Sequence, residues 1–404
     1  MSASKKGLAL GDLIQSIEPS PTLSITALAG SLKAAGHDII SFSAGQPDFD
    51  TPDHIKEAAK AALDAGKTKY EPVVGVKVLR DAVAKLYTER GLKDLSAANV
   101  VISTGAKHSL YGCTQVLLDP GDECIIPAPY WVTYPAQVLL ARATPVFVGS
   151  TEDNGFKMTA ADFRAAITPR TRMLILNSPN NPTGAVYTRA ELEAIADVCL
   201  EHQIAVLWDS IYDELIYGGL EMLEFATLRP GLQDLTITVN GLSKSHAMTG
   251  WRLGYLVAPP AVADAVSKLQ SQSTSNATSI TQWAALAALQ GDQEPTRAMK
   301  VHFDRRRKLM VELLRAIPGV TCAEPMGAFY TFPNLSAHLG KTGPDGVIAD
   351  DNALCNHLLK NCGVATVPGS AFGAPGNVRL SYATDDDSIR AGLARIAEGL
   401  AALK

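Results

Sequence analysis

The chain has no apolar run close to the roughly 20 residues that a membrane-spanning helix needs. No two of its cysteines have the C-x-x-C spacing of a zinc or redox motif. Membrane-spanning helices and a cysteine-based metal centre are therefore not expected, and we predict no metal site. The six cysteines lie apart, mostly in apolar surroundings. They are predicted to be buried free thiols, which are typical of a reducing compartment and favour the cytoplasm.

A large excess of charge of one sign is also lacking, and the content of charged residues is ordinary for a globular enzyme. Charged residues make up 19% of the 404 residues, and the formal net charge is −5, so neither a nucleic acid nor an anionic membrane is expected as a partner. Residues 1–12 contain two lysines, but Gly11 and Asp12 interrupt their apolar stretch, which predicts a mobile arm and not a secretory signal. The sequence has no visible internal repeat or low-complexity tract. Its length predicts a globular protein with two lobes.

What the sequence does contain is a series of short, apolar, β-branched runs that alternate with helix-like segments. Runs of this kind are covered on both faces, which is typical of a mainly parallel sheet. We therefore predict an α/β fold whose large domain has a mainly parallel seven-stranded sheet, flanked by helices in three layers. Thr51-Pro52 predicts a helix N-cap followed by a first-turn proline, and Thr188 with Glu191 predicts a capping box. The seven runs are 99–103, 123–126, 145–148, 172–176, 204–208, 236–239 and 253–257.

The pattern changes near residue 294, where a long basic helix is followed by antiparallel-type strands and further helices. This predicts a smaller α+β domain. Helix-like residues 22–35 and a strand at 38–43 are expected to join it, so that the small domain is built from both chain ends. The basic run 305–308 is predicted to be a solvated helix face. The predicted boundaries are 1–45 for an N-terminal arm and part of the small domain, 46–294 for the large domain and 295–404 for the small C-terminal domain.

The most informative segment is 240–252. Lys244 lies between two apolar runs, its neighbours are small or hydroxylated, and the only other cation in the segment is Arg252. An amine at the mouth of a buried sheet is partly desolvated, which lowers its pKa and suits a nucleophile that condenses with a carbonyl. Arg252 offers a planar fork for a phosphate. The pair suggests pyridoxal 5′-phosphate as cofactor; the alternative is a structural lysine on a strand-end loop.

Further polar segments follow predicted strands, where α/β sheets bind their ligands. Residues 103–107 open a helix whose free N–H groups can bind a phosphate, or they form a plain turn. Residues 177–184 hold asparagines in a proline-rich turn. Asp209 ends an apolar strand, so its carboxylate needs a partner, such as a protonated pyridine nitrogen; a helix N-cap is the alternative. Arg379 is either a clamp for a carboxylate or a solvated edge residue.

These segments, above all 177–184 and 243–255, resemble the class I aminotransferases of the fold-type I pyridoxal-phosphate enzymes. The closest likeness is to the bacterial and plant branch of aspartate and aspartate/prephenate aminotransferases, from about residue 8 to the C-terminus. The resemblance implies that the large domain binds the cofactor. It also implies three catalytic residues: Lys244 attaches the cofactor and moves the proton, Asp209 pairs with the pyridine nitrogen, and Tyr212 donates to the phenolate oxygen.

The same resemblance implies the other contacts. Tyr70 would reach the cofactor phosphate of a neighbouring subunit, which implies a homodimer. Many members have a hydroxyl residue three positions before the lysine, where this chain has Gly241, so one phosphate hydrogen bond is expected to be absent. The remaining implied cofactor contacts are Asn181, Trp131, Arg252, Gly105, Ala106, Lys107 and Ser243. The implied substrate contacts are Gly45, Trp131, Asn181, Arg379, Thr22 and Lys107.

The implied function is transfer of an amino group between L-aspartate or L-glutamate and 2-oxoglutarate or oxaloacetate, by a ping-pong Schiff-base mechanism in amino acid metabolism and biosynthesis. Prephenate stays open as a further substrate. Two alternatives use the same scaffold: an aromatic or broad-specificity aminotransferase, and a β-elimination C–S lyase. A regulatory module that binds the cofactor is disfavoured, because such proteins usually add a DNA-binding domain and this chain has no basic segment for one. The preferred donor, the pathway and the extent of lobe closure stay open.

Overall fold

A central seven-stranded sheet organises the computed structural model, which describes residue 8 and residues 10–404. The strand order is β2-β8-β7-β6-β5-β3-β4. All neighbouring strands are parallel except that β8 is antiparallel to both β2 and β7. The mainly parallel seven-stranded sheet is thus confirmed. Its strands are β2 (Val100–Ser103), β3 (Glu123–Ala128), β4 (Thr144–Gly149), β5 (Thr171–Asn177), β6 (Ala205–Asp209), β7 (Thr236–Gly241) and β8 (Gly254–Val257).

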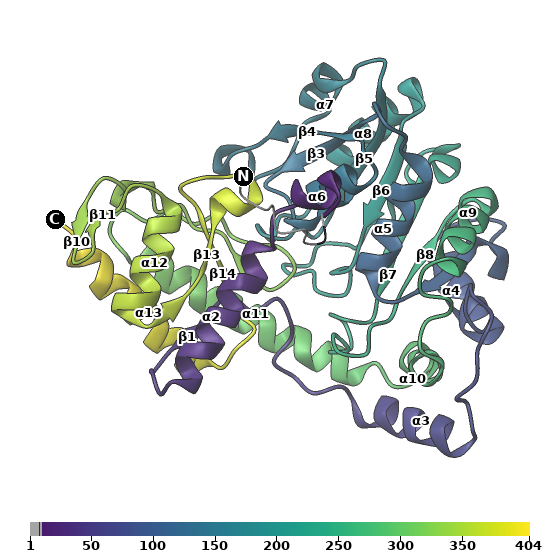
Figure 1. Ribbon diagram of the computed structural model, residues 1–404, viewed down its shortest axis with the longest axis horizontal. Coiled ribbons are helices and arrows are strands. Elements are labelled where there is room, and N and C mark those ends of the chain that lie inside the picture. Colours follow the sequence, from purple (N-terminus) through teal and green to yellow (C-terminus); the bar gives the residue numbers. More distant parts are fainter. Residues whose placement is uncertain (1–7, 9) are drawn as a thin grey trace, which may run out of the picture.

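Helices cover both faces of this sheet (Figure 1). On one face, α5, α6 and α9 pack against side chains such as Val101 and Leu256. On the other face, α4, α8 and α10 pack against the side chains that alternate with these, such as Val100 and Val257. The predicted three layers are therefore present. The helices of this part are α3 (Asp53–Asp64), α4 (Lys77–Glu89), α5 (Ala106–Leu117), α6 (Thr133–Leu140), α7 (Ala160–Ala166), α8 (Arg189–His202), α9 (Pro260–Ser271) and α10 (Ser279–Gln290).

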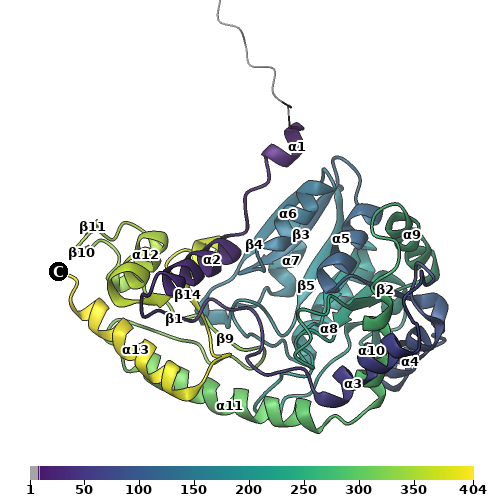
Figure 2. The same cartoon turned by 60° about the horizontal axis from the view of Figure 1, so that its bottom comes forward.

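A smaller α+β part lies beside the sheet and contains elements from both chain ends (Figure 2). Strand β1 pairs in parallel with β12, and β13-β14-β9 form an antiparallel sheet. Residues near 40 therefore lie beside residues near 364 in this part, while the exact domain boundaries stay a prediction. Helix α1 (Asp12–Gln15) stands apart from this part and contacts α6 (Figure 2). The elements of the small part are α2 (Pro21–Ala34), β1 (Ile40–Ser41), α11 (Glu294–Arg315), β9 (Tyr330–Thr331), β10 (Thr342–Gly343), β11 (Gly346–Val347), α12 (Asp351–Cys362), β12 (Val364–Ala365), β13 (Val367–Pro368), β14 (Val378–Ser381) and α13 (Asp386–Ala401).

Two observations concern the predictions about membrane-spanning helices and about the N-terminal segment. None of the helices in the described part of the chain combines the length and apolar character needed to cross a membrane. The predicted mobile arm at residues 1–12 falls largely outside the described residues, which omit 1–7 and 9.

Of the two helix starts predicted from local sequence signals, one is confirmed and one is wrong. The capping box of Thr188 and Glu191 is present at the start of α8 and is confirmed. The N-cap at Thr51 is wrong, because α3 begins at Asp53 and its N-cap position is Pro52. The Thr51 hydroxyl is used elsewhere: it donates to the Ala247 carbonyl at 2.7 Å and accepts from Trp251 Nε1 at 2.9 Å. It therefore ties the start of the large domain to the loop that follows Lys244.

The prediction that residues 305–308 form a solvated face is also wrong at two positions. Arg306 and Arg307 are 7% and 2% exposed. Arg306 pairs with Asp48 at 2.9 Å, and Arg307 pairs with Glu324 at 2.6 Å. The helical period places these two residues on the face of α11 that packs on the core. Their aliphatic stems are buried there, and their guanidinium groups pair with acidic side chains. As a result, α11 is bound directly to the segment that carries Gly45.

Candidate active site

A cavity of about 430 Å³ lies at the carboxyl ends of β5 and β6, between the large sheet and elements of the small part. Two residues of the predicted site are not among its lining side chains. Gly105 lies close to the Arg252 side chain, which lines the cavity, and Tyr70 lies on the surface with 92% of its area exposed. The predicted residues that do line the cavity are Thr22, Gly45, Ala106, Lys107, Trp131, Asn181, Asp209, Tyr212, Ser243, Lys244, Arg252 and Arg379.

The Lys244 side chain projects from the loop after β7 and is half-buried in the cavity wall. Its Nζ donates a hydrogen bond of 2.6 Å to the carbonyl of Gly45. Burial lowers the pKa of Lys244 to about 8, and the positive charges of Arg379 and Arg252 act in the same direction. A larger fraction of the amine is therefore unprotonated near neutral pH than for an ordinary lysine, as a nucleophilic amine requires.

This lowered pKa predicts a pH dependence in the chain without cofactor. Acetylation of Lys244 by acetic anhydride, followed by peptide mass spectrometry, should reach half of its maximal rate near pH 8, because only the neutral amine reacts. The surface lysine Lys60, on the exposed side of α3, is the internal control for the reaction. A Lys244 profile that coincides with that of Lys60 would show that the cavity does not perturb the amine.

Asp209 ends β6 and is 3% exposed. Its Oδ2 accepts a hydrogen bond of 2.7 Å from the Tyr134 hydroxyl, and its Oδ1 accepts one of 3.2 Å from the Ile211 N–H. Burial raises the pKa of this carboxyl to about 6, although both hydrogen bonds and the charge of Lys244 favour the anion. A cation that entered the cavity next to Asp209 would lower this pKa again and hold the carboxylate ionised.

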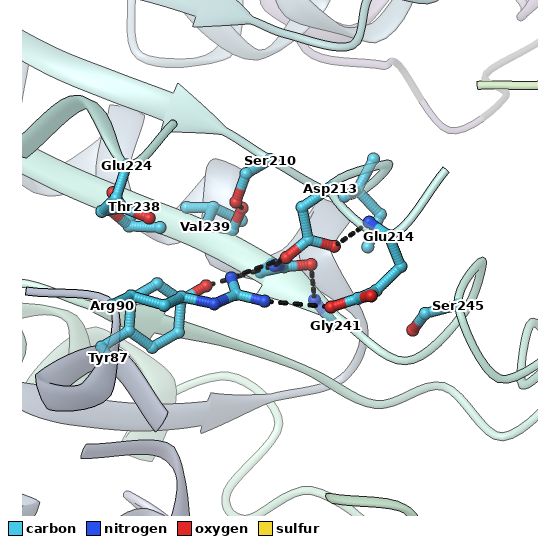
Figure 3. A network of polar contacts seen from close by, with 12 residues as sticks. Tyr87, Arg90, Ser210, Asp213, Glu214, Glu224, Thr238, Val239, Gly241 and Ser245 are labelled. Carbon is cyan, nitrogen blue, oxygen red and sulfur yellow. Dashed lines mark hydrogen bonds and ion pairs between the residues drawn. The ribbon is translucent and has the colours of Figure 1, made fainter. Parts of the chain in front are cut away.

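Tyr212 follows Asp209 by three residues and is fixed from two sides. Its hydroxyl lies 3.0 Å from that of Tyr330. The next residue, Asp213, accepts a hydrogen bond of 2.7 Å from Arg90 (Figure 3). Asp213 accepts a second one of 2.7 Å from the Asn240 side chain. Asn240 lies near the end of β7, just before the Lys244 loop. The network therefore fixes the turn that carries Tyr212 relative to the strand that leads to the amine.

Arg379 on β14 is 2% exposed and has no acidic partner within the described residues. It donates to the side-chain oxygen of Asn181 at 3.0 Å and to the Ser43 carbonyl at 2.9 Å. Its Nε lacks a hydrogen-bond partner in the described structure. A buried cation with a free donor that faces a cavity is suited to an anionic ligand, and a carboxylate fits the guanidinium fork.

The N-terminus of α5 and Arg252 form a second anion seat at another part of the cavity. Gly105 precedes the helix with φ of +87°, and a Cβ atom there would lie 2.6 Å from Arg252 Nη2. A Cβ atom at Gly254 would lie 2.2 Å from the Ala106 nitrogen. Only glycines allow this close approach, which brings the free N–H groups of the first helical turn next to a guanidinium. Such a seat matches a phosphate.

Gly241 is the position where many members of the resembling class have a hydroxyl side chain. A Cβ atom at this position would lie 3.0 Å from both the Cα of Gly254 and the carbonyl oxygen of Leu253. These are backbone atoms at the start of the adjacent strand β8 and in the residue before it, so they cannot move aside easily. In this chain the close packing of β7 and β8 therefore explains why a glycine, and not a hydroxyl residue, occupies the position.

Lys107, Trp131 and Thr22 surround the outer part of the cavity. Lys107 Nζ lies 4.9 Å from the centre of the Trp131 ring. Burial and the charge of Arg252 lower the pKa of Lys107. Thr22 reaches the cavity from α2, which belongs to the small part. This region thus combines one cation, one aromatic face and a hydroxyl group.

Several cavity residues were missed by sequence reasoning. Asn177 donates to the Asp209 carbonyl at 2.9 Å and accepts from the Asn181 N–H at 2.9 Å. The sequence could have pointed to Asn177, because this residue is the first of the proline-rich turn 177–184 that follows a predicted strand. Tyr134 and Tyr330 lie within a helix and a short strand whose patterns are those of ordinary core residues, so no local signal distinguished them. The other missed lining residues are Leu23, Thr26, Ser43, Ala44, Gln46, Leu110, Ile211 and Thr249.

These groups fit pyridoxal 5′-phosphate. The amine of Lys244 suits its aldehyde, and Asp209 suits its ring nitrogen. The helix terminus with Arg252 suits its phosphate, while Trp131 offers an aromatic face. The fold and the cavity therefore define a fold-type I enzyme that depends on this cofactor.

Comparison with known proteins gives the family. A model described as aminotransferase class I and II matches residues 37–396. An aspartate aminotransferase of Geobacillus stearothermophilus is 48% identical and covers 96% of this chain and 98% of its own. An aspartate/prephenate aminotransferase of Cereibacter sphaeroides is 49% identical, with 96% and 97% covered. The chain belongs to the class I and II aminotransferases, whose class I aspartate aminotransferases use pyridoxal 5′-phosphate.

Solved structures agree with this assignment. The crystal structure of the aspartate aminotransferase from Rhizobium meliloti has a TM-score of 0.94 at 41% identity, covering 98% of this chain and 100% of that one. The aspartate aminotransferase from Thermus thermophilus with maleate has a TM-score of 0.91 at 41% identity, covering 97% and 100%. The α/β fold with its large and small parts is therefore that of an aminotransferase.

Proposed function

We propose that this aminotransferase exchanges amino groups between aspartate or glutamate and the corresponding 2-oxo acids. One observation carries the proposal: Lys244, Asp209 and Arg379 face a single cavity, and no acidic side chain in the described part of the chain pairs with Arg379. The names of the full-length relatives support the substrate class, since they are aspartate or aspartate/prephenate aminotransferases.

In this proposal Arg379 binds the α-carboxylate of the amino acid. The guanidinium is already oriented by Asn181 and by the Ser43 carbonyl, so little side-chain entropy is lost when the substrate arrives. Binding would also compensate the burial that lowers the pKa of Arg379. The carboxylate would then place the Cα–H bond within the part of the cavity that Lys244 lines.

Pyridoxal 5′-phosphate, when bound, supplies an aldehyde for the amino group and a ring that takes up electrons from the substrate. Asp209 would hold the ring nitrogen cationic, and Tyr212 would donate a hydrogen bond to the phenolate oxygen, near Asn181. The phosphate would bind at the N-terminus of α5 and Arg252. Lys244, as a neutral amine, would take the proton from the substrate Cα and return it on the opposite step.

The acidic side chain of the substrate needs a second recognition site. We assign it to Lys107 and Thr22, because both line the outer cavity and Lys107 has no acidic partner among the described residues. The aromatic face of Trp131 next to Lys107 is also compatible with aromatic substrates, which we propose as a second preference. Prephenate, which has both a ring and carboxylates, is compatible with the same surroundings.

Lys107→Ala tests this assignment. The KM for aspartate should rise about tenfold or more, since a hydrogen bond to a charged group contributes about 1.5–3 kcal/mol. The KM for phenylalanine should change less than about twofold. Lys60→Ala, on the exposed surface of α3, is the matched control and should leave both constants unchanged. Equal effects of Lys107→Ala on the two substrates would remove Lys107 from side-chain recognition.

The function itself is tested with a panel of amino donors against 2-oxoglutarate and oxaloacetate. We expect aspartate and glutamate to give the highest kcat/KM. A panel led by aromatic donors would instead favour the aromatic or broad-specificity enzyme. Release of pyruvate from cysteine or cystathionine without any 2-oxo acid acceptor would favour the C–S lyase.

We further propose that the enzyme is a homodimer in which Tyr70 reaches the phosphate seat of the partner. Its support is that Tyr70 is almost fully exposed in the single chain and lies outside that chain's own cavity. Mixed dimers provide the test, because a Lys244→Ala subunit keeps Tyr70 and a Tyr70→Ala subunit keeps Lys244. Unfolding and refolding the two variants together should restore about half of the wild-type sites in each mixed dimer. A fully active monomer in light scattering would contradict the proposal.

A cytoplasmic location is proposed from the thiols. All six cysteines are free in the described structure, and five of them are buried. Unpaired cysteines are typical of proteins in a reducing compartment. If the protein isolated from normally growing cells contained disulfide bonds, this result would argue against the cytoplasmic location.

A further inference from the structure

Tyr134 is a residue to which neither the motifs nor the proposed mechanism gives a task. It lies in the first turn of α6, is 2% exposed and donates the 2.7 Å hydrogen bond to Asp209 Oδ2. Its ring stands edge-on to that of Trp131 at a centroid distance of 5.4 Å and an angle of 86°. The short segment 131–134 therefore supplies both a wall of the cavity and a direct contact to the buried carboxyl.

The direction of this hydrogen bond is fixed by the acidities of the two groups. Burial, together with the adjacent Asp209 carboxylate, raises the pKa of the Tyr134 phenol well above its ordinary value. The phenol therefore keeps its proton at every pH at which an enzyme works. Tyr134 is the donor and Asp209 the acceptor, and a donor favours the ionised form of a carboxyl.

Few other groups around Asp209 favour the anion. On its own element, the Ile211 N–H donates to Oδ1 at the longer distance of 3.2 Å. From the loop after β7, Lys244 contributes its positive charge across the cavity. From β5, Asn177 contacts only the main-chain carbonyl of Asp209. The neighbouring Tyr212 phenol is neutral, because burial raises its pKa well above the ordinary value.

We propose that Tyr134 is a positioning residue that keeps the Asp209 carboxylate ionised and aimed into the cavity, and so sets the lowest pH at which the site can hold a cationic ring nitrogen. This proposal rests on the proposed function, in which Asp209 pairs with that nitrogen. The contact between the two side chains, in contrast, belongs to the chain alone and can be measured without cofactor.

The test is the ionisation midpoint of Asp209 in the cofactor-free chain, followed by carbon NMR after labelling the aspartate carboxyl carbons. The Asp209 signal is assigned by its loss in Asp209→Asn. In Tyr134→Phe the midpoint should rise by about 1 to 2 pH units, since a hydrogen bond to a charged group contributes about 1.5–3 kcal/mol. Tyr382→Phe is the control, because that buried tyrosine donates to the Ala328 carbonyl in the small part and does not line the cavity, so it should leave the midpoint unchanged.

A second variant covers the case in which Tyr134→Phe does not fold. Site-specific 3-fluorotyrosine at position 134 keeps the shape of the ring and makes the phenol a stronger donor, so the midpoint should fall below that of the wild type. A midpoint that is unchanged in either folded variant would overturn the proposal. A shifted midpoint in a chain that proves unable to bind pyridoxal 5′-phosphate would leave Tyr134's role intact and reject the proposed function instead.

As a second readout, the dissociation constant of pyridoxal 5′-phosphate is measured from pH 5 to 9 by the visible absorbance of the holoenzyme. In Tyr134→Phe the loss of affinity on acidification should begin at a higher pH than in the wild type, while the affinity at pH 9 stays close to it. A loss of affinity by the same factor at every pH would indicate a purely structural role for the tyrosine and would contradict the proposal.

Discussion

Lys244→Ala should lower the kcat of transamination by about 10⁴-fold or more, because one side chain both attaches the cofactor and moves the proton, and proton transfer alone typically contributes about 10²–10⁴-fold. The variant should still bind pyridoxal 5′-phosphate, since the phosphate seat at α5 and Arg252 remains. Stopped assays with aspartate and 2-oxoglutarate measure the rate, and equilibrium dialysis measures the bound cofactor.

Two further observations make this result specific. Lys107→Ala, which removes another cavity amine, should keep a kcat within about tenfold of the wild type. Added methylamine should restore part of the activity of Lys244→Ala, because a small free amine can enter the space that the side chain left. Normal turnover by Lys244→Ala would reject the assignment of this residue and the proposed mechanism with it.

Asp209→Asn should lower kcat by about 10²–10⁴-fold. The variant keeps the shape of the side chain but loses its charge, and removal of one partner of a buried ion pair costs about 3–5 kcal/mol. The affinity for the cofactor should fall as well, and the absorbance band of the bound cofactor should shift, because the ring nitrogen loses its anionic partner. Assays of kcat together with visible spectra at constant pH measure both effects.

The matched control for this change is Asp197→Asn. Asp197 pairs with Arg229 on the surface at 2.7 Å, and surface ion pairs contribute about 0–1 kcal/mol. This control should leave kcat and the spectrum unchanged. If Asp209→Asn behaved in the same way as Asp197→Asn, the carboxylate would have no part in the electronic control of the cofactor.

Much of the large domain could be predicted from the sequence because each of its signals is local. A buried parallel strand needs a short, continuous apolar run, and each of the seven predicted runs overlaps one strand of the sheet. The residues that follow these strands, such as Asn181, Asp209 and Lys244, come together because parallel strands end at the same edge. A local sequence pattern that locates the end of a parallel strand therefore also locates residues of the ligand-binding site.

What could not be predicted depends on contacts between distant segments. The Lys244 amine donates to Gly45, which is 199 positions away, and Arg379 donates to Asn181, which is 198 positions away. The burial of Arg306 depends on Asp48 in the same manner. Tyr134 is a different case. Its sequence surroundings are those of an ordinary core aromatic residue, and the role that we propose for it depends on the single hydrogen bond that it donates to Asp209. Partners of this kind are visible only once the chain is folded.

The short strands of the small part show the same limit. Residues 38–43 were predicted as a strand, but β1 spans only Ile40–Ser41. Its length is set by pairing with Val364–Ala365, and not by its own sequence. The two-residue strand is held by tertiary packing, since Ile40 packs beside Gly392 of α13 and its partner β12 contacts α2 and α12, and local propensity does not encode such packing.

The most direct test of the central claim is borohydride reduction of the purified protein after incubation with pyridoxal 5′-phosphate. We expect a yellow protein whose colour is lost on reduction, with the mass of one reduced cofactor on the peptide that contains Lys244. Label on a different lysine, or no label together with full aminotransferase activity, would contradict the account.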